Sequence, residues 1–127
     1  MARKKALVIG GLGVIGRNLI NHMAVLDDWD IVAVSRRAPD AEMAAKADFI
    51  SCDLLDMAAA EVKLAHLDDV THVFCCALYG GIDATNTAQN RALVANPVIV
   101  MSSVSKQLQR VVLQEGSKAY GRQLGPF

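Results

Sequence analysis

The sequence predicts an α/β fold, a parallel β-sheet doubly wound by helices, and three observations lead to it. Short apolar runs of strand length alternate along the chain with runs whose apolar residues have helical spacing. The first apolar run ends in a glycine-rich turn that leads directly into a helix-like run. The 127 residues suffice for about one domain. Alternation of this kind is typical of strand–helix–strand units, in which neighbouring strands are parallel.

The turn after the first strand carries the most specific signal. We expect Ala6–Gly10 to be a central strand, since it is apolar on both faces, and Val14–Leu26 to be the following helix. A helix that begins here directs its free N–H groups at the turn, which suits a phosphate. A side chain at position 10 or 13 would hold a pyrophosphate off the backbone, and one at 16 would hold the helix off the strand. An incidental tight turn is the alternative to a dinucleotide site formed by Gly10, Leu12, Gly13, Val14, Ile15 and Gly16.

The remaining elements continue the alternation. Further strands are expected at Trp29–Val34, Ala47–Cys52, Thr71–Cys76 and Leu108–Gln114. Further helices are expected at Ala41–Lys46, Met57–Leu64 and Asp83–Ser103, with Asp56 capping the second and Asp83 or Thr85 the third. About five strands give the order 3-2-1-4-5 if the Rossmann pattern holds, and residues 115–127 are expected to be loop.

Two details of the helices are predicted from residue spacing and type. The first helix has Ile15, Leu19, Met23 and Leu26 on one apolar stripe. The last helix contains Pro97, which removes a backbone donor, so a kink or break is expected near residues 93–97.

Composition excludes several classes of protein. The formal net charge is zero, which gives no reason to expect a nucleic-acid partner or a polybasic membrane patch. The apolar runs are too short to span a bilayer, and the N-terminus does not read as a signal peptide. We therefore expect a cytoplasmic protein. Cys52, Cys75 and Cys76 are expected to be buried free thiols, and the cysteines and histidines lack metal-ligand spacing.

The residues after the second strand bear on the choice of cofactor. Ser35, Arg36 and Arg37 lie about twenty residues past the glycine turn, where an acidic residue would bind the ribose 2′-hydroxyl of NAD. Arginine at this place pairs with the 2′-phosphate of NADP instead. We expect NADP(H) to be the cofactor, and the alternative is a solvated basic turn.

Other candidate residues follow the third, fourth and fifth strands. Asp53 and Leu54 should lie near the adenine, where Asp53 either accepts from the adenine amino group or caps the next turn. Ala77 and Leu78 end the fourth strand beside the expected ligand. Gln114, a further candidate for cofactor binding, ends the fifth strand, and Lys118 follows it. A lysine there can contact the nicotinamide ribose and lower the pKa of a nearby acid, or it is an ordinary surface lysine.

Three features together resemble the extended short-chain dehydrogenase/reductase superfamily, whose members are often labelled NAD(P)-dependent epimerase/dehydratase. They are the Gly10–Gly16 turn, Asp53–Leu54 and the strand–loop order. Within it, Gln114–Tyr120 and Gly125–Phe127 are similar to the progesterone 5β-reductase and iridoid synthase group. This resemblance implies hydride transfer from NADPH to an activated C=C or C=O bond of a small molecule. Lys118 matches the lysine that serves the family's site.

The resemblance also implies that residues 1–127 form only the cofactor-binding Rossmann domain. The family's catalytic tyrosine, strands six and seven and the substrate-binding part would then lie beyond Phe127, and whether this chain has activity alone stays open. The alternatives are a sugar-nucleotide epimerase/dehydratase domain, against which Arg36 argues, and a non-catalytic NADPH-binding module. An exposed fifth-strand edge and the apolar helix Asp83–Ser103 predict a homodimer or larger assembly.

Overall fold

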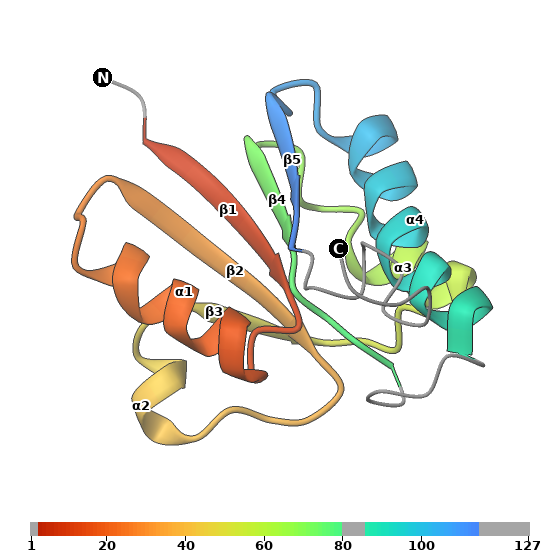
Figure 1. Ribbon diagram of the computed structural model, residues 1–127. Coiled ribbons are helices and arrows are strands. Elements are labelled where there is room, and N and C mark those ends of the chain that lie inside the picture. Colours follow the sequence, from red (N-terminus) through yellow and green to blue (C-terminus); the bar gives the residue numbers. More distant parts are fainter. Residues whose placement is uncertain (1–2, 80–85, 115–127) are drawn as a thin grey trace, which may run out of the picture.

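The computed structural model describes residues 3–79 and 86–114 and contains the predicted alternation of strands and helices (Figure 1). The expected caps Asp83 and Thr85 and the expected loop 115–127 lie outside these residues. The elements are β1 (Lys4–Ile9), α1 (Val14–Ala24), β2 (Trp29–Ser35), α2 (Ala41–Ala44), β3 (Asp48–Ser51), α3 (Met57–Lys63), β4 (His72–Cys75), α4 (Thr87–Val104) and β5 (Arg110–Leu113).

The five strands form one parallel sheet in the order β3-β2-β1-β4-β5, which confirms the predicted fold class and strand order. β1 is central, and its Val8 lies opposite Ala33 of β2 and Phe74 of β4. The last four residues of β1 are buried, as expected for a strand covered on both faces. The carboxyl ends of β1 to β4 therefore meet at one edge of the sheet.

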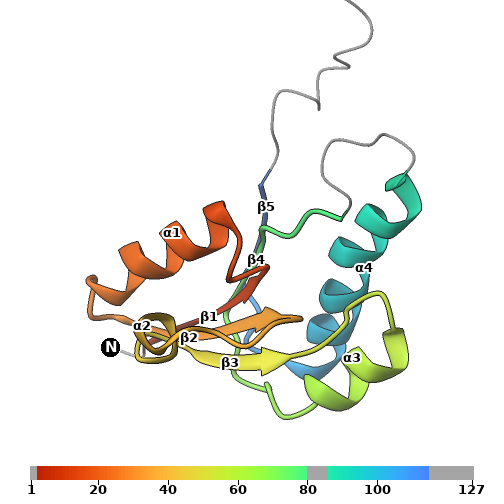
Figure 2. The ribbon, with the colours of Figure 1, turned by 90° about the horizontal axis from the view of Figure 1, so that it is seen from below.

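The helices cover the two faces of the sheet with separate apolar cores (Figure 2). Val8 and Ala33 pack on one face with Ile20 of α1 and Met43 of α2. Leu7 and Val73 pack on the other face with Ala60 of α3 and with α4. Alternating residues of each strand serve opposite cores because successive side chains point to opposite faces.

The buried face of α1 differs from the predicted stripe. Ile15 and Leu26, expected to be buried, are 47% and 45% exposed, whereas the buried residues of α1 are Gly16, Ile20 and Met23. The cause is the close approach of Gly16 to the end of β1, where a Cβ would overlap the carbonyl oxygen of Gly10. This contact fixes the rotation of the helix and turns Ile20 toward the sheet.

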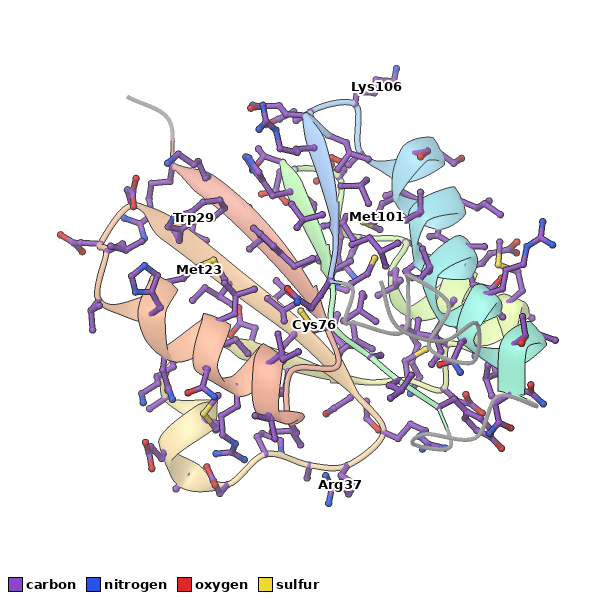
Figure 3. All side chains as sticks on the ribbon, in the orientation of Figure 1. Met23, Trp29, Arg37, Cys76, Met101 and Lys106 are labelled. Carbon is purple, nitrogen blue, oxygen red and sulfur yellow. The ribbon has the colours of Figure 1, made fainter. Side chains whose placement is uncertain are left out.

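Of the kink or break expected near residues 93–97, the break is wrong, because α4 runs as one helix from Thr87 to Val104 with Pro97 inside it. Pro97 is fully buried, and Val100 and Met101 beyond it are also buried. Packing of this face against the sheet compensates for the single lost backbone donor. Figure 3 shows Met101 between α4 and the sheet. The predicted cap of α3 is confirmed, since Asp56 Oδ1 accepts from the N–H of Ala59 at 3.2 Å.

His72 has a structural environment at the amino end of β4. Its ring packs edge-on against Trp29 with centroids 4.9 Å apart, and Thr71 Oγ1 lies 2.8 Å from His72 Nδ1. Partial burial, followed by the charges of Arg110 and Lys4, lowers the pKa of His72. The imidazole is therefore neutral at pH 7 and lies at the opposite end of the strand from the glycine turn.

The packing of α4 predicts a clear difference between two of its apolar residues. Met101→Ala removes a fully buried side chain and should lower the free energy of unfolding by about 2–5 kcal/mol. Ile99 is 55% exposed, so Ile99→Ala should change it by only about 0.5 kcal/mol. Urea denaturation followed by circular dichroism measures both, and equal losses would contradict the assigned orientation of α4.

Candidate functional site

An open cavity of about 570 Å³ lies at the carboxyl ends of β1 to β4. Ligands of open α/β sheets bind at this edge, where the strand order reverses between β1 and β4. The lining residues are Ile9, Gly10, Leu12, Gly13, Val14, Ile15, Val34, Ser35, Arg36, Arg37, Cys52, Asp53, Leu54, Leu55, Cys76, Ala77, Leu78, Tyr79 and Leu93. The structure thus brings together most residues predicted to bind cofactor.

Two predicted site residues do not line the cavity, and a third is not described by the structure. Gly16 is buried between α1 and the end of β1, and it does not line the cavity. Gln114 directly follows β5, where its N–H donates to the carbonyl oxygen of Cys75 at 3.1 Å, and it does not line the cavity either. Lys118 lies outside the described residues.

The glycines of the turn are required for different reasons. Gly10 has φ +82°, and a Cβ there would lie 2.8 Å from Ala77 Cα, so the exit of β4 excludes any side chain. Contact with Ala77 therefore already requires glycine at position 10, independently of the expected reason, which was the approach of a pyrophosphate. At Gly13 a Cβ would lie 3.5 Å from Gly10 O, an ordinary contact. The surrounding protein atoms therefore leave room for a side chain at position 13. Such a side chain would instead obstruct a ligand that approaches this part of the backbone.

The turn presents unpaired main-chain donors to the cavity. Gly10 and Gly11 donate their N–H groups to the carbonyl oxygen of Val34. By contrast, the N–H groups of Leu12, Val14 and Ile15 have no hydrogen-bond partner within residues 3–79 and 86–114. The first turn of α1 also contains no acidic side chain that would neutralise the positive end of its dipole. Unpaired amides at the start of a helix form a site for an anion such as a phosphate.

The end of β2 supplies the positive charge of the cavity. Ser35 Oγ donates to the carbonyl oxygen of Arg37 at 2.6 Å, so the Ser35 hydroxyl holds the turn in shape. Ser51 Oγ donates to the carbonyl oxygen of Arg36 at 3.4 Å from the neighbouring strand. The side chains of both arginines are exposed, and neither has an ion pair or hydrogen bond in the described part of the chain. Figure 3 shows Arg37 extending away from the sheet.

The end of β3 forms the next wall of the cavity. Asp53 Oδ1 accepts from the N–H of Leu55 at 3.0 Å, so the carboxylate caps the turn, which is one of the two roles expected for it. Leu54 is 4% exposed and belongs to the core beneath α3 and α4. This wall of the cavity is therefore apolar, with one carboxylate at its edge.

The wall formed by the end of β4 is held by α4. Ala77, Leu78 and Tyr79 follow the strand, and Leu78 is 66% exposed at the cavity. Asn90 Oδ1 accepts from the N–H of Tyr79 at 2.8 Å, and Asn90 Nδ2 donates to the carbonyl oxygen of Tyr79 at 3.2 Å. Sequence reasoning missed Asn90. The available signal was an amide side chain in the first turn of a helix that follows a strand end.

Cys52 and Cys76 line the cavity and were also missed as site residues. The three cysteines are free, and Cys75 and Cys76 belong to opposite cores. Cys52 and Cys75 are buried as expected, whereas Cys76 is only half-buried. Burial raises the pKa of each thiol, and that of Cys75 to about 11. All three are protonated at pH 7, so they are poor nucleophiles.

The described residues show neither a metal site nor a membrane span. Among them, no group of three His, Cys, Asp or Glu side chains has an arrangement able to hold a metal ion. No helix in the same part of the chain is both long enough and apolar enough to cross a bilayer. The cavity described above combines unpaired amides, two arginines and apolar walls. This arrangement can hold a large ligand that carries separated phosphates.

The sequence matches known proteins along nearly its whole length. The model of the NAD dependent epimerase/dehydratase family matches residues 6–126. The chain is 32% identical to 3-oxo-Delta(4,5)-steroid 5-beta-reductase of Arabidopsis thaliana over 96% of its own length. It is 33% identical to (S)-8-oxocitronellyl enol synthase of Catharanthus roseus over 91% of its length. These matches cover 32% and 30% of the two relatives, so the chain spans about a third of them.

Solved structures share the fold at lower sequence identity. A short-chain dehydrogenase/reductase of Burkholderia vietnamiensis superposes with a TM-score of 0.70 and 21% identity, covering 94% of this chain and 66% of that one. The 3-oxoacyl-(acyl-carrier protein) reductase of Brucella melitensis, solved in complex with NAD, superposes with a TM-score of 0.64 and 19% identity. That match covers 82% of this chain and 49% of the reductase. These likenesses show the Rossmann-type fold.

The geometry of the turn predicts unequal effects of alanine at two glycines. Gly10→Ala places a side chain in a left-handed conformation against Ala77 and should lower the free energy of unfolding by about 2–4 kcal/mol. Gly13→Ala fits its surroundings and should change it by less than about 1 kcal/mol. Urea denaturation decides, and a Gly13→Ala variant as unstable as Gly10→Ala would contradict this account.

Proposed function

The chain belongs to the NAD dependent epimerase/dehydratase family, and from this premise we propose that its cavity binds NADP(H). Membership confirms the resemblance inferred from the sequence and supports a nicotinamide dinucleotide as the ligand. The preference for the phosphorylated form is our own inference. One observation carries it: Arg36 and Arg37 lie exposed on the rim of the cavity that contains the unpaired amides, without side-chain partners in the described residues.

Three parts of the dinucleotide have counterparts among the lining residues. The amides of Leu12, Val14 and Ile15 would bind the pyrophosphate at the start of α1. Arg36 and Arg37 would bind the 2′-phosphate, because guanidinium groups pair with phosphates through parallel hydrogen bonds. The apolar wall at Leu54 would lie against the adenine. The cofactor, when bound, supplies the hydride.

For a protein of the relatives' full length that contains this chain, we propose reduction of an activated C=C or C=O bond of a small molecule by hydride transfer. Two relatives support this reaction, a steroid 5-beta-reductase and an oxocitronellyl enol synthase. In this chain, the described lining residues bind and orient the dinucleotide, and the role of Lys118 stays a prediction. An epimerase/dehydratase domain acting on sugar nucleotides is the alternative, and the arginine at position 36 argues against it.

The cofactor preference is tested by titrating the protein with NADPH and NADH in a calorimeter. Arg36→Ala should weaken NADPH binding about 10- to 100-fold, since it removes a charge-assisted hydrogen bond, and should change NADH binding less than about twofold. Gly13→Ala should weaken both dinucleotides alike, because both contain the pyrophosphate. Arg110→Ala, at the opposite end of the sheet, is the control for net charge. Equal losses of NADPH and NADH in Arg36→Ala would refute the 2′-phosphate assignment.

We also propose that the chain self-associates through the outer edge of β5. All four residues of β5 are exposed, and in the described part of the chain β5 pairs only with β4. The helix expected to contribute is largely covered, since Leu93, Val94 and Val98 pack against the core and Ile99 is its one exposed large apolar residue in the described range. Unpaired strand edges with apolar side chains favour pairing with a second copy.

Light scattering at about 10 μM tests this association, a concentration at which edge-paired copies should show a mass above the monomer. Val112→Lys should lower that mass, because a charged side chain at an edge strand opposes pairing. A monomeric mass for the unmodified protein would contradict the proposal.

A further inference from the structure

Two asparagines of α4 hold the backbones of two different cavity walls. Asn90 binds both the N–H and the C=O of Tyr79, in the wall that follows β4. Asn96 Nδ2 donates to the carbonyl oxygen of Leu54 at 2.7 Å, in the wall that follows β3. Leu93 lies between them on the helix surface and itself lines the cavity.

The bonds of Asn90 replace the strand pairing that ends before Tyr79. The last backbone bonds near the end of β4 are Cys76 N to Ile9 O, at 2.9 Å, and Gln114 N to Cys75 O, at 3.1 Å. Beyond them, Asn90 offers Tyr79 an acceptor and a donor, as a neighbouring strand would. Asn90 Nδ2 also donates to Asn86 O at 3.0 Å, which orients the amide along its own helix. The segment from Ala77 to Tyr79 is thereby fixed relative to α4.

α4 is a firm support for these bonds. Pro97, Val100 and Met101 are buried against the sheet. At the carboxyl end of the helix, Ser105 Oγ donates to the carbonyl oxygen of Val70 at 2.7 Å. The helix is thus attached to the β4 side of the sheet along its length, while its asparagines extend to the two walls.

We propose that Asn90 and Asn96 are positioning residues, which set the separation of the two walls for a dinucleotide. This proposal rests on the proposed function. Through Leu54, Asn96 positions the wall that follows β3, where we place the adenine. Through Tyr79, Asn90 positions the wall that follows β4, against which the nicotinamide half of the dinucleotide would lie. Because the distance between the walls is already set, dinucleotide binding does not have to order them, and its entropic cost is smaller.

The test compares a whole cofactor with half of it. NADPH and adenosine 2′,5′-bisphosphate, which has only the adenine half, are titrated into the unmodified chain and into Asn90→Leu, Asn96→Leu and Ser102→Ala. Ser102 is exposed on α4 and is the control. Asn96→Leu should weaken both ligands about five- to tenfold, whereas Asn90→Leu should weaken NADPH by that factor and leave the bisphosphate within about twofold. A purely structural role would not separate the ligands in this way.

Amide hydrogen exchange at Tyr79 provides a readout that needs no ligand. Asn90→Leu should speed exchange of the Tyr79 N–H about tenfold. Asn90→Asp is a second variant of nearly the same size in case leucine does not fold. Its carboxylate still accepts the Tyr79 N–H but loses both bonds that Nδ2 donates, so exchange should be faster than in the unmodified chain and slower than in Asn90→Leu. Unchanged exchange in Asn90→Leu, affinities all within twofold, or equal losses of both ligands in both leucine variants would overturn the proposal. If the unmodified chain bound neither ligand, the proposed function would fail, and exchange at Tyr79 would still decide whether Asn90 fixes this wall.

Discussion

The structure depends on one close approach, where the end of β1, the start of α1 and the exit of β4 meet without side chains between them. Gly10 faces Ala77, and Gly16 faces the carbonyl oxygen of Gly10. A Cβ at either glycine would separate elements that the parallel order β2-β1-β4 brings together. α1 begins close to the strand end, and the amides of Leu12, Val14 and Ile15, three residues that line the cavity, have no protein partner in the described residues.

Although the formal net charge is zero, the two ends of the strands differ in charge. At the amino ends, Lys4 pairs with Asp28 and Lys5 with Asp69. At the carboxyl ends, Arg36 and Arg37 are exposed without ion-pair partners in the described part of the chain. The cavity end is therefore positive, through these arginines and the start of α1, while the charges at the other end are largely compensated.

The strand order and much of the cavity could be predicted from the sequence. The alternating apolar runs indicate the strands and helices, and the glycine turn indicates the Rossmann pattern, from which the strand order and the place of the site follow. Prediction from the sequence failed where tertiary contacts decide. The rotation of α1, which buries Ile20 rather than Ile15, follows from the approach of Gly16. Continuity of α4 through Pro97 follows from burial against the sheet. Asn96 binds a backbone group 42 residues away in sequence, which no local pattern indicates, and the one signal for Asn90 was its place in the first turn of α4.

The central claim is that main-chain amides at the start of α1 bind the pyrophosphate of a nicotinamide dinucleotide. Its most direct measurement is a nitrogen–proton NMR correlation spectrum recorded while NADPH is added. The account predicts that the amide resonances of Leu12, Val14 and Ile15 shift together and saturate with a common dissociation constant, while the amide of Val62, exposed on α3, stays in place. Saturable binding that leaves those three amide resonances unmoved, or no binding at all, would contradict it.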